Sequence, residues 1–264
     1  MTDELKQKAT NVLKAIETGE SGPVAAINAE NYVQHNLTVP DGLAGFGEVL
    51  AQLPEGSARV ETVRVFRDGD FVFSHTDYDF FGPKIGFDLF RFEDGLIVEH
   101  WDNLIETAPA NPSGRTQIDG PTDVEDLEAT DANKALVLKF VETVLMAGDT
   151  ENLTDFINPD YYRQHNPSIA DGLDGLGAAL AAFAEQGIVM AYDTIHGVFG
   201  EGNFVLTVSE GSLGGAASSF YDLFRIADGR IVEHWDIIET IADEADRANQ
   251  NGKFGALATV GGRA

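Results

Sequence analysis

The same series of motifs occurs twice in this sequence, and the repeat constrains the fold more than any other feature. YVQHNLTVPDGLAGFGEVL at 32–50 matches YRQHNPSIADGLDGLGAAL at 162–180, with ten of nineteen positions identical. FDLFRFEDGLIVEHWD at 87–102 matches YDLFRIADGRIVEHWD at 221–236, with twelve of sixteen identical. The matching segments keep their order and lie much further apart than the roughly 20–50 residues of a solenoid unit. The sequence therefore predicts two copies of one domain.

The stretch between the repeats predicts the domain boundaries. It is rich in Pro, Gly and acidic residues and lacks apolar periodicity, as linkers and loops do. We place the first copy at 1–115, a linker at 116–129 and the second copy at 130–264. NPSGR at the end of the first copy has an echo in NQNGK near the end of the second. Part of the linker is therefore expected to be a tail that folds back on its own copy.

Each copy is predicted to begin with helices and to continue as an antiparallel sheet. Leu136, Phe140 and Val144 lie at helical spacing before a stop at Gly148, and residues 2–18 are the counterpart of this helix. Runs of Val, Phe, Ile and Thr follow, separated by the turn sequences RDGD, EDG, EGN and ADG. Helices followed by hairpins indicate an α+β domain.

Composition excludes several kinds of site and partner. The chain has no cysteine, so disulfides, thiolate metal sites and cysteine nucleophiles are excluded. Its net charge is −27, from 44 acidic and 17 basic residues, which argues against nucleic acid or an anionic membrane as a partner. No apolar run approaches the ~20 residues of a membrane span. The amphipathic first residues are unlike a secretory signal, so we expect a cytoplasmic protein.

The histidines divide into matched and unmatched positions. His35 matches His165 and His100 matches His234, whereas the second copy has Val208 where the first has His75. Because alternate residues of a strand point to opposite faces, His100 shares a face with Val98 and Asp102, and Trp101 lies on the other.

Asp88 is the most conspicuous carboxylate, because it shares a strand face with Phe90 and Phe92. A buried carboxylate either pairs with a donor or keeps its proton through a raised pKa. His75 shares a face with Phe73 in the preceding predicted strand. If the two strands are neighbours, we expect His75 and Asp88 to meet across an apolar pocket.

The motifs QHNP, DLFR…DG.IVEHWD and NPSGRTQIDGPT resemble the SnoaL-like branch of the nuclear-transport-factor-2-like superfamily, over nearly all of both copies. The resemblance implies two tandem cones, each a curved antiparallel sheet wrapped by helices around an apolar cavity. Such domains usually dimerise through the sheet, so the copies would form an intrachain pseudo-dimer, with further oligomerisation possible. SnoaL-like cyclases need no cofactor and perform intramolecular aldol closure with an Asp assisted by a His.

The resemblance places the Asp of these cyclases at Asp88 and Asp222, and their His about one strand earlier, which suits His75. The second copy has Val208 there, so a single catalytic site would belong to the first copy. We therefore expect Asp88 and His75 to be catalytic, with His35 as a second donor at the cavity mouth. Removing a proton next to a carbonyl requires such a base, a donor for the enolate oxygen and exclusion of water.

His100 and His234 are interpreted mainly as framework residues, since both copies retain them, and Asp222 without a His partner as structural. The expected substrate-binding residues are Tyr32, Phe73, Phe90, His100, Trp101, His165, Asp222, Phe224, His234 and Trp235.

Three functions remain open from the sequence. The leading one is cofactor-independent acid/base chemistry, either aldol-type cyclisation or isomerisation of a small hydrophobic carbonyl compound. The others are a hydrolase similar to epoxide hydrolases and a non-catalytic binding protein for a hydrophobic molecule. His35, His75, His100 and Asp88 could supply metal ligands, but their spacing is not that of a metal motif, so no metal and no cofactor are expected.

Overall fold

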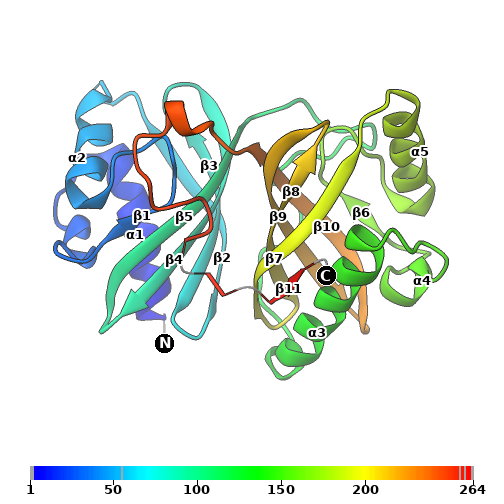
Figure 1. Ribbon diagram of the computed structural model, residues 1–264. Coiled ribbons are helices and arrows are strands. Elements are labelled where there is room, and N and C mark those ends of the chain that lie inside the picture. Colours follow the sequence, from blue (N-terminus) through cyan, green and yellow to red (C-terminus); the bar gives the residue numbers. More distant parts are fainter. Residues whose placement is uncertain (1–2, 55, 256, 259, 263–264) are drawn as a thin grey trace. The chain divides into compact units, whose positions relative to one another are not determined.

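The computed structural model describes residues 3–54, 56–255, 257–258 and 260–262, and its chain divides into two compact units (Figure 1). One unit comprises Met1–Thr107 with Ile241–Ala256, and the other comprises Ala108–Thr240 with Leu257–Ala264. Each unit contains one copy of the repeat and has its own sheet and helices.

The first unit is built on a five-stranded sheet in the order β1-β5-β4-β3-β2. Its elements are α1 (Glu4–Thr18), a 3-10 turn η1 (Pro23–Ala26), β1 (Val33–Gln34), α2 (Gly42–Gln52), β2 (Arg59–Asp68), β3 (Phe71–Asp79), β4 (Pro83–Glu93), β5 (Leu96–Glu106) and a 3-10 turn η4 (Glu244–Asp246). Neighbouring strands from β2 to β5 are antiparallel, and β1 adds in parallel to β5.

The second unit repeats this plan with a six-stranded sheet in the order β11-β7-β8-β9-β10-β6. Its elements are a 3-10 turn η2 (Leu127–Ala129), α3 (Thr130–Phe140), a π-helical segment η3 (Val141–Met146), α4 (Leu153–Phe156), β6 (Arg163–Gln164), α5 (Gly172–Glu185), β7 (Met190–Glu201), β8 (Phe204–Leu213), β9 (Ala216–Ala227), β10 (Arg230–Thr240) and β11 (Gly261–Gly262). The π-helical segment continues α3 where the first copy has the last turns of α1.

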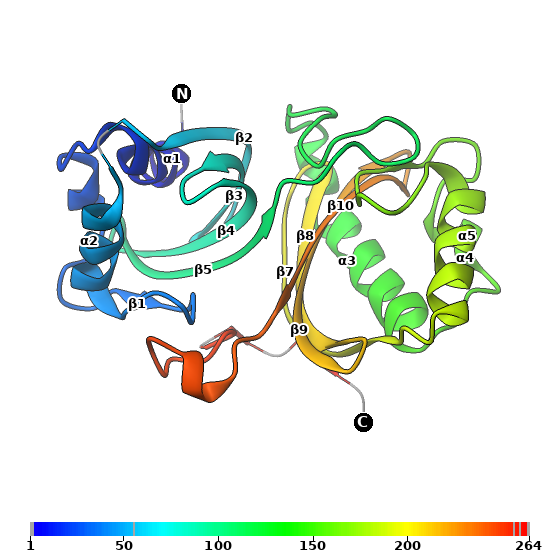
Figure 2. The same ribbon diagram turned by 90° about the horizontal axis from the view of Figure 1, so that it is seen from above.

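Each unit is an α+β cone, and the predicted fold class is confirmed. Figure 2 shows each sheet curving around the side that its helices close, α1 and α2 in one unit and α3 and α5 in the other. Bulges at Arg91/Phe92 and Ile231/Glu233 interrupt equivalent strand pairs and add to this curvature. The concave side of each sheet therefore faces its helices, and side chains there are enclosed.

The predicted turns at EDG and ADG are confirmed as two-residue hairpin loops. Asp94 and Gly95 have φ values of 50° and 76°, and Asp228 and Gly229 have values of 50° and 70°. Positive φ at both central residues is the geometry that suits the twist of a hairpin, and Asp-Gly adopts it readily. These loops fix the register of β4 on β5 and of β9 on β10.

The two tails are exchanged, which differs from the predicted boundary at 115. Asn111 belongs to the second unit, where its Nδ2 donates to the carbonyls of Gln164 at 2.6 Å and Ile169 at 2.9 Å. Asn249 belongs to the first unit, where its Nδ2 donates to the carbonyls of Asn36 at 2.7 Å and Val39 at 2.8 Å.

The resemblance of NPSGR to NQNGK thus reflects one structural role, but each tail completes the copy from which it does not come. The reason is that the bonds run to backbone carbonyls in the QHN motif and in the loop after it. Both copies offer these carbonyls, so the sequence alone does not show which tail binds which loop.

Asn249→Ala is expected to lower the free energy of unfolding by about 1–3 kcal/mol, because it leaves one buried and one partly buried carbonyl group without their donor. Asn111→Ala removes the equivalent donor from the second unit and should have an effect of similar size. Chemical denaturation followed by circular dichroism measures both. A loss no larger than that of the surface variant Asn11→Ala would contradict the anchoring role.

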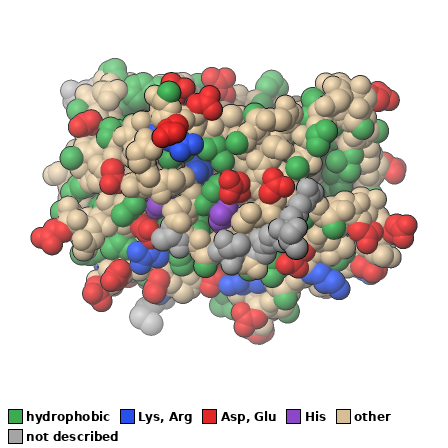
Figure 3. Space-filling model, viewed as in Figure 1, with side chains coloured by type: hydrophobic (Ala, Val, Ile, Leu, Met, Phe, Trp, Pro, Cys, Tyr) green, Lys and Arg blue, Asp and Glu red, His purple; other side chains and the backbone are tan. Residues whose placement is uncertain are grey.

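Within the described part of the chain, no helix has the length and apolar character required to cross a membrane. Acidic side chains are scattered over the face shown in Figure 3, with few Lys and Arg among them. This distribution agrees with a net charge of −27.

Candidate active site

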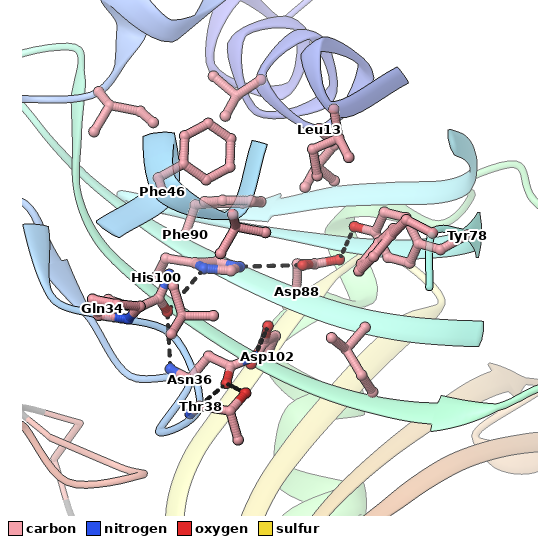
Figure 4. A pocket seen from close by; sticks show the side chains of 18 of the residues that line it. Leu13, Gln34, Asn36, Thr38, Phe46, Tyr78, Asp88, Phe90, His100 and Asp102 are labelled. Carbon is pink, nitrogen blue, oxygen red and sulfur yellow. Dashed lines mark hydrogen bonds and ion pairs between the residues drawn. The ribbon is translucent and has the colours of Figure 1, made fainter. Parts of the chain in front are cut away.

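A cavity of about 330 Å³ lies in the first unit between the concave side of the sheet and the helices (Figure 4). Its walls are largely apolar and include Leu13 from α1, Phe46 from α2 and Phe90 from β4. Three polar side chains from β4 and β5, Asp88, His100 and Asp102, reach the same space. An apolar pocket with a few convergent polar groups is the usual form of a small-molecule site.

Asp88 is the central acid of the cavity and is 2% exposed. Its Oδ1 lies 3.1 Å from Nε2 of His100, and its Oδ2 accepts hydrogen bonds from Tyr78 Oη at 2.7 Å and Ser74 Oγ at 3.3 Å. Burial raises the pKa of Asp88, the nearby Asp102 adds to this, and the bonds from His100 and Tyr78 only partly offset it. Asp88 therefore holds a proton more readily than an ordinary aspartate.

The protonation of His100 follows from the hydrogen-bond network around Gln34. Gln34 Oε1 accepts from the backbone N–H of Asn36 at 2.9 Å and lies 3.2 Å from Nδ1 of His100. Because this oxygen can only accept, Nδ1 carries a hydrogen. Nε2 then faces Asp88, so a hydrogen bond between the two groups requires a proton on one of them. Phe90 stacks on the imidazole, with ring centroids 4.6 Å apart, and fixes its plane.

Asp102 lies directly opposite Asp88 in the register of β4 and β5. Its Oδ2 accepts from Asn36 Nδ2 at 2.9 Å, while its Oδ1 is buried without a hydrogen-bond partner among the described residues. Asp88, His100 and Asp102 each offer a ligand atom, and these atoms lie within 4.8 Å of one another. The set could hold a cation as well as move protons, so both chemistries start from the same three residues.

Tyr32 adds a hydroxyl donor to the cavity wall. Its Oη accepts a hydrogen bond from Gln34 Nε2 at 3.1 Å, which leaves its own hydrogen for a group inside the cavity. Burial raises the pKa of Tyr32, so the phenol keeps this hydrogen throughout the ordinary pH range.

The second copy holds the same constellation. His234 Nε2 lies 3.0 Å from Asp222 Oδ1, and Gln164 lies 3.1 Å from Nδ1 of His234. Asn166 Nδ2 donates to Asp236, as Asn36 does to Asp102. Although burial lowers the pKa of His234, the bond to Asp222 and the charges of Asp236 and Asp222 outweigh it, and the pKa is raised.

Comparison with known proteins identifies the domain. The SnoaL-like domain family matches residues 9–100 and again residues 137–234. The chain belongs to the SnoaL-like family. A comparison with curated protein sequences gives no match. Each copy of this SnoaL-like protein corresponds to one match, as the repeat predicts.

Solved structures similar to the SnoaL-like chain include TsrD from Streptomyces laurentii, with 19% identity over 39% of this chain and 90% of that one, at a TM-score of 0.34. IdmH from Streptomyces antibioticus, described as a candidate polyketide cyclase, has 23% identity over 40% and 91%, at 0.32. An LEH-like epoxide hydrolase from M. tuberculosis has 24% identity over 42% and 84%, at 0.32.

The structure does not bring His75 to Asp88. Ser74 is the residue of β3 opposite Asp88, so His75 lies on the other face of the SnoaL-like sheet, opposite Phe87. There it is fully buried and its Nδ1 lies 3.1 Å from Arg64. The histidine beside Asp88 is His100, which the sequence favoured as a framework residue. The second copy therefore keeps its Asp–His pair although it has Val208 at the position of His75.

His35 also lies away from the cavity. It stacks on Trp101, with ring centroids 4.7 Å apart, and its Nδ1 lies 2.8 Å from the carbonyl of Gly252 in the exchanged tail. His165 stacks on Trp235 in the same way, at 4.5 Å. Burial lowers the pKa of His35, so this ring is neutral. These histidines connect the QHN loop to the tail on the side of the sheet opposite the site.

Of the other expected substrate-binding residues, Tyr32, Phe90 and His100 line the cavity of the first SnoaL-like copy. Phe73 contacts Phe66 and Phe87 on the opposite face of the sheet, where Trp101 also lies. Phe224 stacks on His234 at 4.7 Å, as Phe90 does on His100. Four members of the site are not predicted from the sequence: Gln34, Asn36, Tyr78 and Asp102. Three of these four have identical counterparts in the second copy.

Proposed function

We propose that this SnoaL-like protein is a cofactor-independent acid/base enzyme that removes a proton next to the carbonyl of a small apolar compound. Enolate formation of this kind is the first step of both aldol-type cyclisation and isomerisation. Asp88 is the base, His100 is its proton partner, and Tyr32 is the donor to the developing enolate oxygen.

The protonation of the Asp88–His100 pair supports this assignment. When the proton of their hydrogen bond lies on His100, Asp88 is a carboxylate, and the imidazolium stabilises the negative charge that forms on the substrate. When Asp88 takes the substrate proton, its raised pKa makes the transfer less unfavourable than it would be to an ordinary aspartate. The same group can then return the proton to another carbon of the substrate.

Tyr32 suits the second role because its hydroxyl already accepts from Gln34 and is held in position. A hydrogen bond to an enolate oxygen strengthens as the charge develops, so the donor stabilises the transition state more than the ground state. The largely apolar walls exclude water, which strengthens both interactions. The observation that carries the proposal is the 3.1 Å contact between His100 and Asp88 inside this cavity.

The test is α-deuteration by NMR in deuterated buffer, with a panel of ketones and 1,3-dicarbonyl compounds. We expect faster exchange of at least one compound with the wild-type protein, reduced in Asp88→Asn and retained in His75→Val. The latter is the matched control, since the second copy has Val208 at this position. Retention of activity after EDTA treatment separates acid/base chemistry from a cation held by the same residues. Binding without exchange of any compound would instead support a ligand-binding protein.

A further inference from the structure

We infer that the second copy carries an acid/base site of its own, centred on Asp222 and His234, that takes carbonyl compounds of a different shape from those of the first copy. The inference rests on the proposed function of the first site and extends it. It starts from an exchange of aromatic residues inside the two cones.

An aromatic ring and a glycine have changed places between the copies. The first copy has Tyr78 on β3 and Gly86 on β4, and a Cβ at Gly86 would lie 2.5 Å from the ring of Tyr78. The equivalent positions in the second copy hold Gly211 on β8 and Phe220 on β9. One ring fills this part of each cone, but from opposite strands, so the two arrangements exclude each other.

The second copy therefore has no tyrosine at the position of Tyr78, whose phenol donates to Asp88. A tyrosine on another strand supplies the phenol instead. Tyr192 lies on β7 opposite Gly211, where the first copy has Val60 opposite Tyr78. Its Oη lies 3.2 Å and 3.3 Å from the two carboxylate oxygens of Asp222. The ring of Tyr192 packs on Phe220 with centroids 4.3 Å apart.

A phenylalanine at 192 could pack in the same place, so the hydroxyl is not explained by packing. The hydroxyl preserves the contacts of the acid, because in each copy the aspartate contacts one phenol and one imidazole. The two copies thus reach the same arrangement around Asp88 and Asp222 from different strands. This favours a shared chemical role over a purely structural one.

The walls around the second acid have a different shape. At the helix that covers the sheet, Phe140 stands where the first copy has Val12, and its ring contacts Phe224 at a centroid distance of 5.6 Å. Its larger ring occupies space beside α3, whereas the smaller Val12 lines the cavity beside α1 in the first copy. A ligand of the second copy therefore lies further from α3 than a ligand of the first copy lies from α1.

The wall formed by the second helix of the cone carries smaller side chains in the second copy. Three residues of α2 that line the first cavity, Phe46, Val49 and Gln52, are replaced in α5 by Leu176, Ala179 and Ala182. These three residues of α5 lie at helical spacing but stay only half-buried. The same partial burial marks Phe46 and Val49 beside the cavity of the first copy. We place the ligand of the second copy under α5.

The second site is no less accessible than the first, because Asp236 and Asn166 are half-buried whereas their counterparts Asp102 and Asn36 are buried. The chemistry of its polar groups matches that of the first site, so its substrate class is again a small apolar carbonyl compound. The difference lies in shape: compounds with bulk directed towards the first helix suit the first copy, and compounds that extend along α5 suit the second.

The test measures α-deuteration of a size-graded panel of ketones and 1,3-diketones with Asp88→Asn, Asp222→Asn and the double variant. We expect Asp88→Asn to retain an exchange rate at least about tenfold above the double variant for some compounds, ranked differently from those of Asp222→Asn. Phe220→Ala in the Asp88→Asn background should shift the ranking towards bulkier compounds. If that variant does not fold, Tyr192→Phe should lower the residual rate with little change in unfolding.

The outcomes separate this inference from the proposed function. Equal rates for Asp88→Asn and the double variant with every compound would overturn the second site and leave the first intact. Loss of exchange only in Asp222→Asn would support the second site and overturn the first. Identical rankings in the two single variants would contradict the difference in shape. No exchange by the wild-type protein would overturn both.

Discussion

Asp88→Asn is expected to lower the rate of α-proton exchange at the first site by about 10²–10⁴-fold, the usual contribution of a general acid or base. The amide has nearly the shape of the carboxyl group and can still contact Tyr78 and His100, so the fold should persist. Because residual exchange at the second site would mask part of the loss, the measurement is best made in the Asp222→Asn background. A loss below tenfold would contradict the role of Asp88 as the base.

The pH dependence of this exchange should identify the same group. Asp88 acts as a base in its carboxylate form, and burial raises its pKa above the ordinary 3.8. The rate should therefore rise with pH through a range above that value, and this limb should be absent from the residual rate of Asp88→Asn. The dependence of the exchange rate on pH is measured by quenching the reaction at fixed times at a series of pH values and detecting deuterium by NMR.

The free energy of unfolding should fall over the pH range in which the exchange rate rises. Since its folded-state pKa is raised, Asp88 binds its proton more tightly in the folded than in the unfolded chain, and folding is disfavoured as pH rises through that pKa. Asp88→Asn removes this cost. We expect its unfolding midpoint at neutral pH to equal or exceed that of the wild type, with the advantage disappearing at acidic pH.

Glu233→Gln is expected to cost about 3–5 kcal/mol of unfolding free energy, because it breaks a buried network of charges. Glu233 is fully buried, and its carboxylate lies 2.9 Å from His165 Nε2 and 2.8 Å from Arg225 Nε. The neutral amide leaves the guanidinium of Arg225 without its counter-charge in a position that is only 13% exposed.

Glu99→Gln is the matched control in the first copy. There the partner Arg91 is 32% exposed and His35 Nε2 lies 3.5 Å from Glu99, so water compensates more of the loss. We expect a cost of about 1–3 kcal/mol. Equal effects of the two variants in urea denaturation would contradict the importance of burial.

The pH dependence of the Glu233 effect has a definite sign. Burial alone would raise the pKa of Glu233, but the bonds from His165 and Arg225 outweigh it and hold the pKa below its usual 4.5. A depressed pKa contributes stability above the unfolded value, and this stability is lost as pH falls through the folded value. The difference between wild type and Glu233→Gln should therefore shrink in acid.

The sequence predicted the fold well because the fold depends on periodicity, turns and repetition. The hairpin loops at Asp94-Gly95 and Asp228-Gly229 and the succession of antiparallel strands after the helices follow from local sequence, whereas the edge strands β1, β6 and β11 were not predicted. The expectation that His75 meets Asp88 was wrong because of the strand register. Alternation assigns faces within one strand, but only the pairing of Ser74 with Asp88 decides which residues of β3 share the face of Asp88.

A better signal for the site was present in the sequence. Asp88 and His100, like Asp222 and His234, lie on either side of an Asp-Gly hairpin loop. A hairpin centred on that loop brings the two ends of the motif together, and both copies retain both residues. Retention of His100 and His234 alone favours a structural role, but in both copies the retained histidine contacts the retained aspartate. The tyrosines could not be paired in this way, because Tyr78 and Tyr192 come from strands that do not correspond.

The exchanged tails have a consequence for synthesis on the ribosome. The loop of the first copy that contains His35 is bonded to Asn249, Asn251 and Gly252. All three emerge only after almost the whole second copy has been translated. The first copy therefore cannot complete its own structure until these residues have been made, although its sheet is made first. Completion of the first copy is therefore coupled to synthesis of the second.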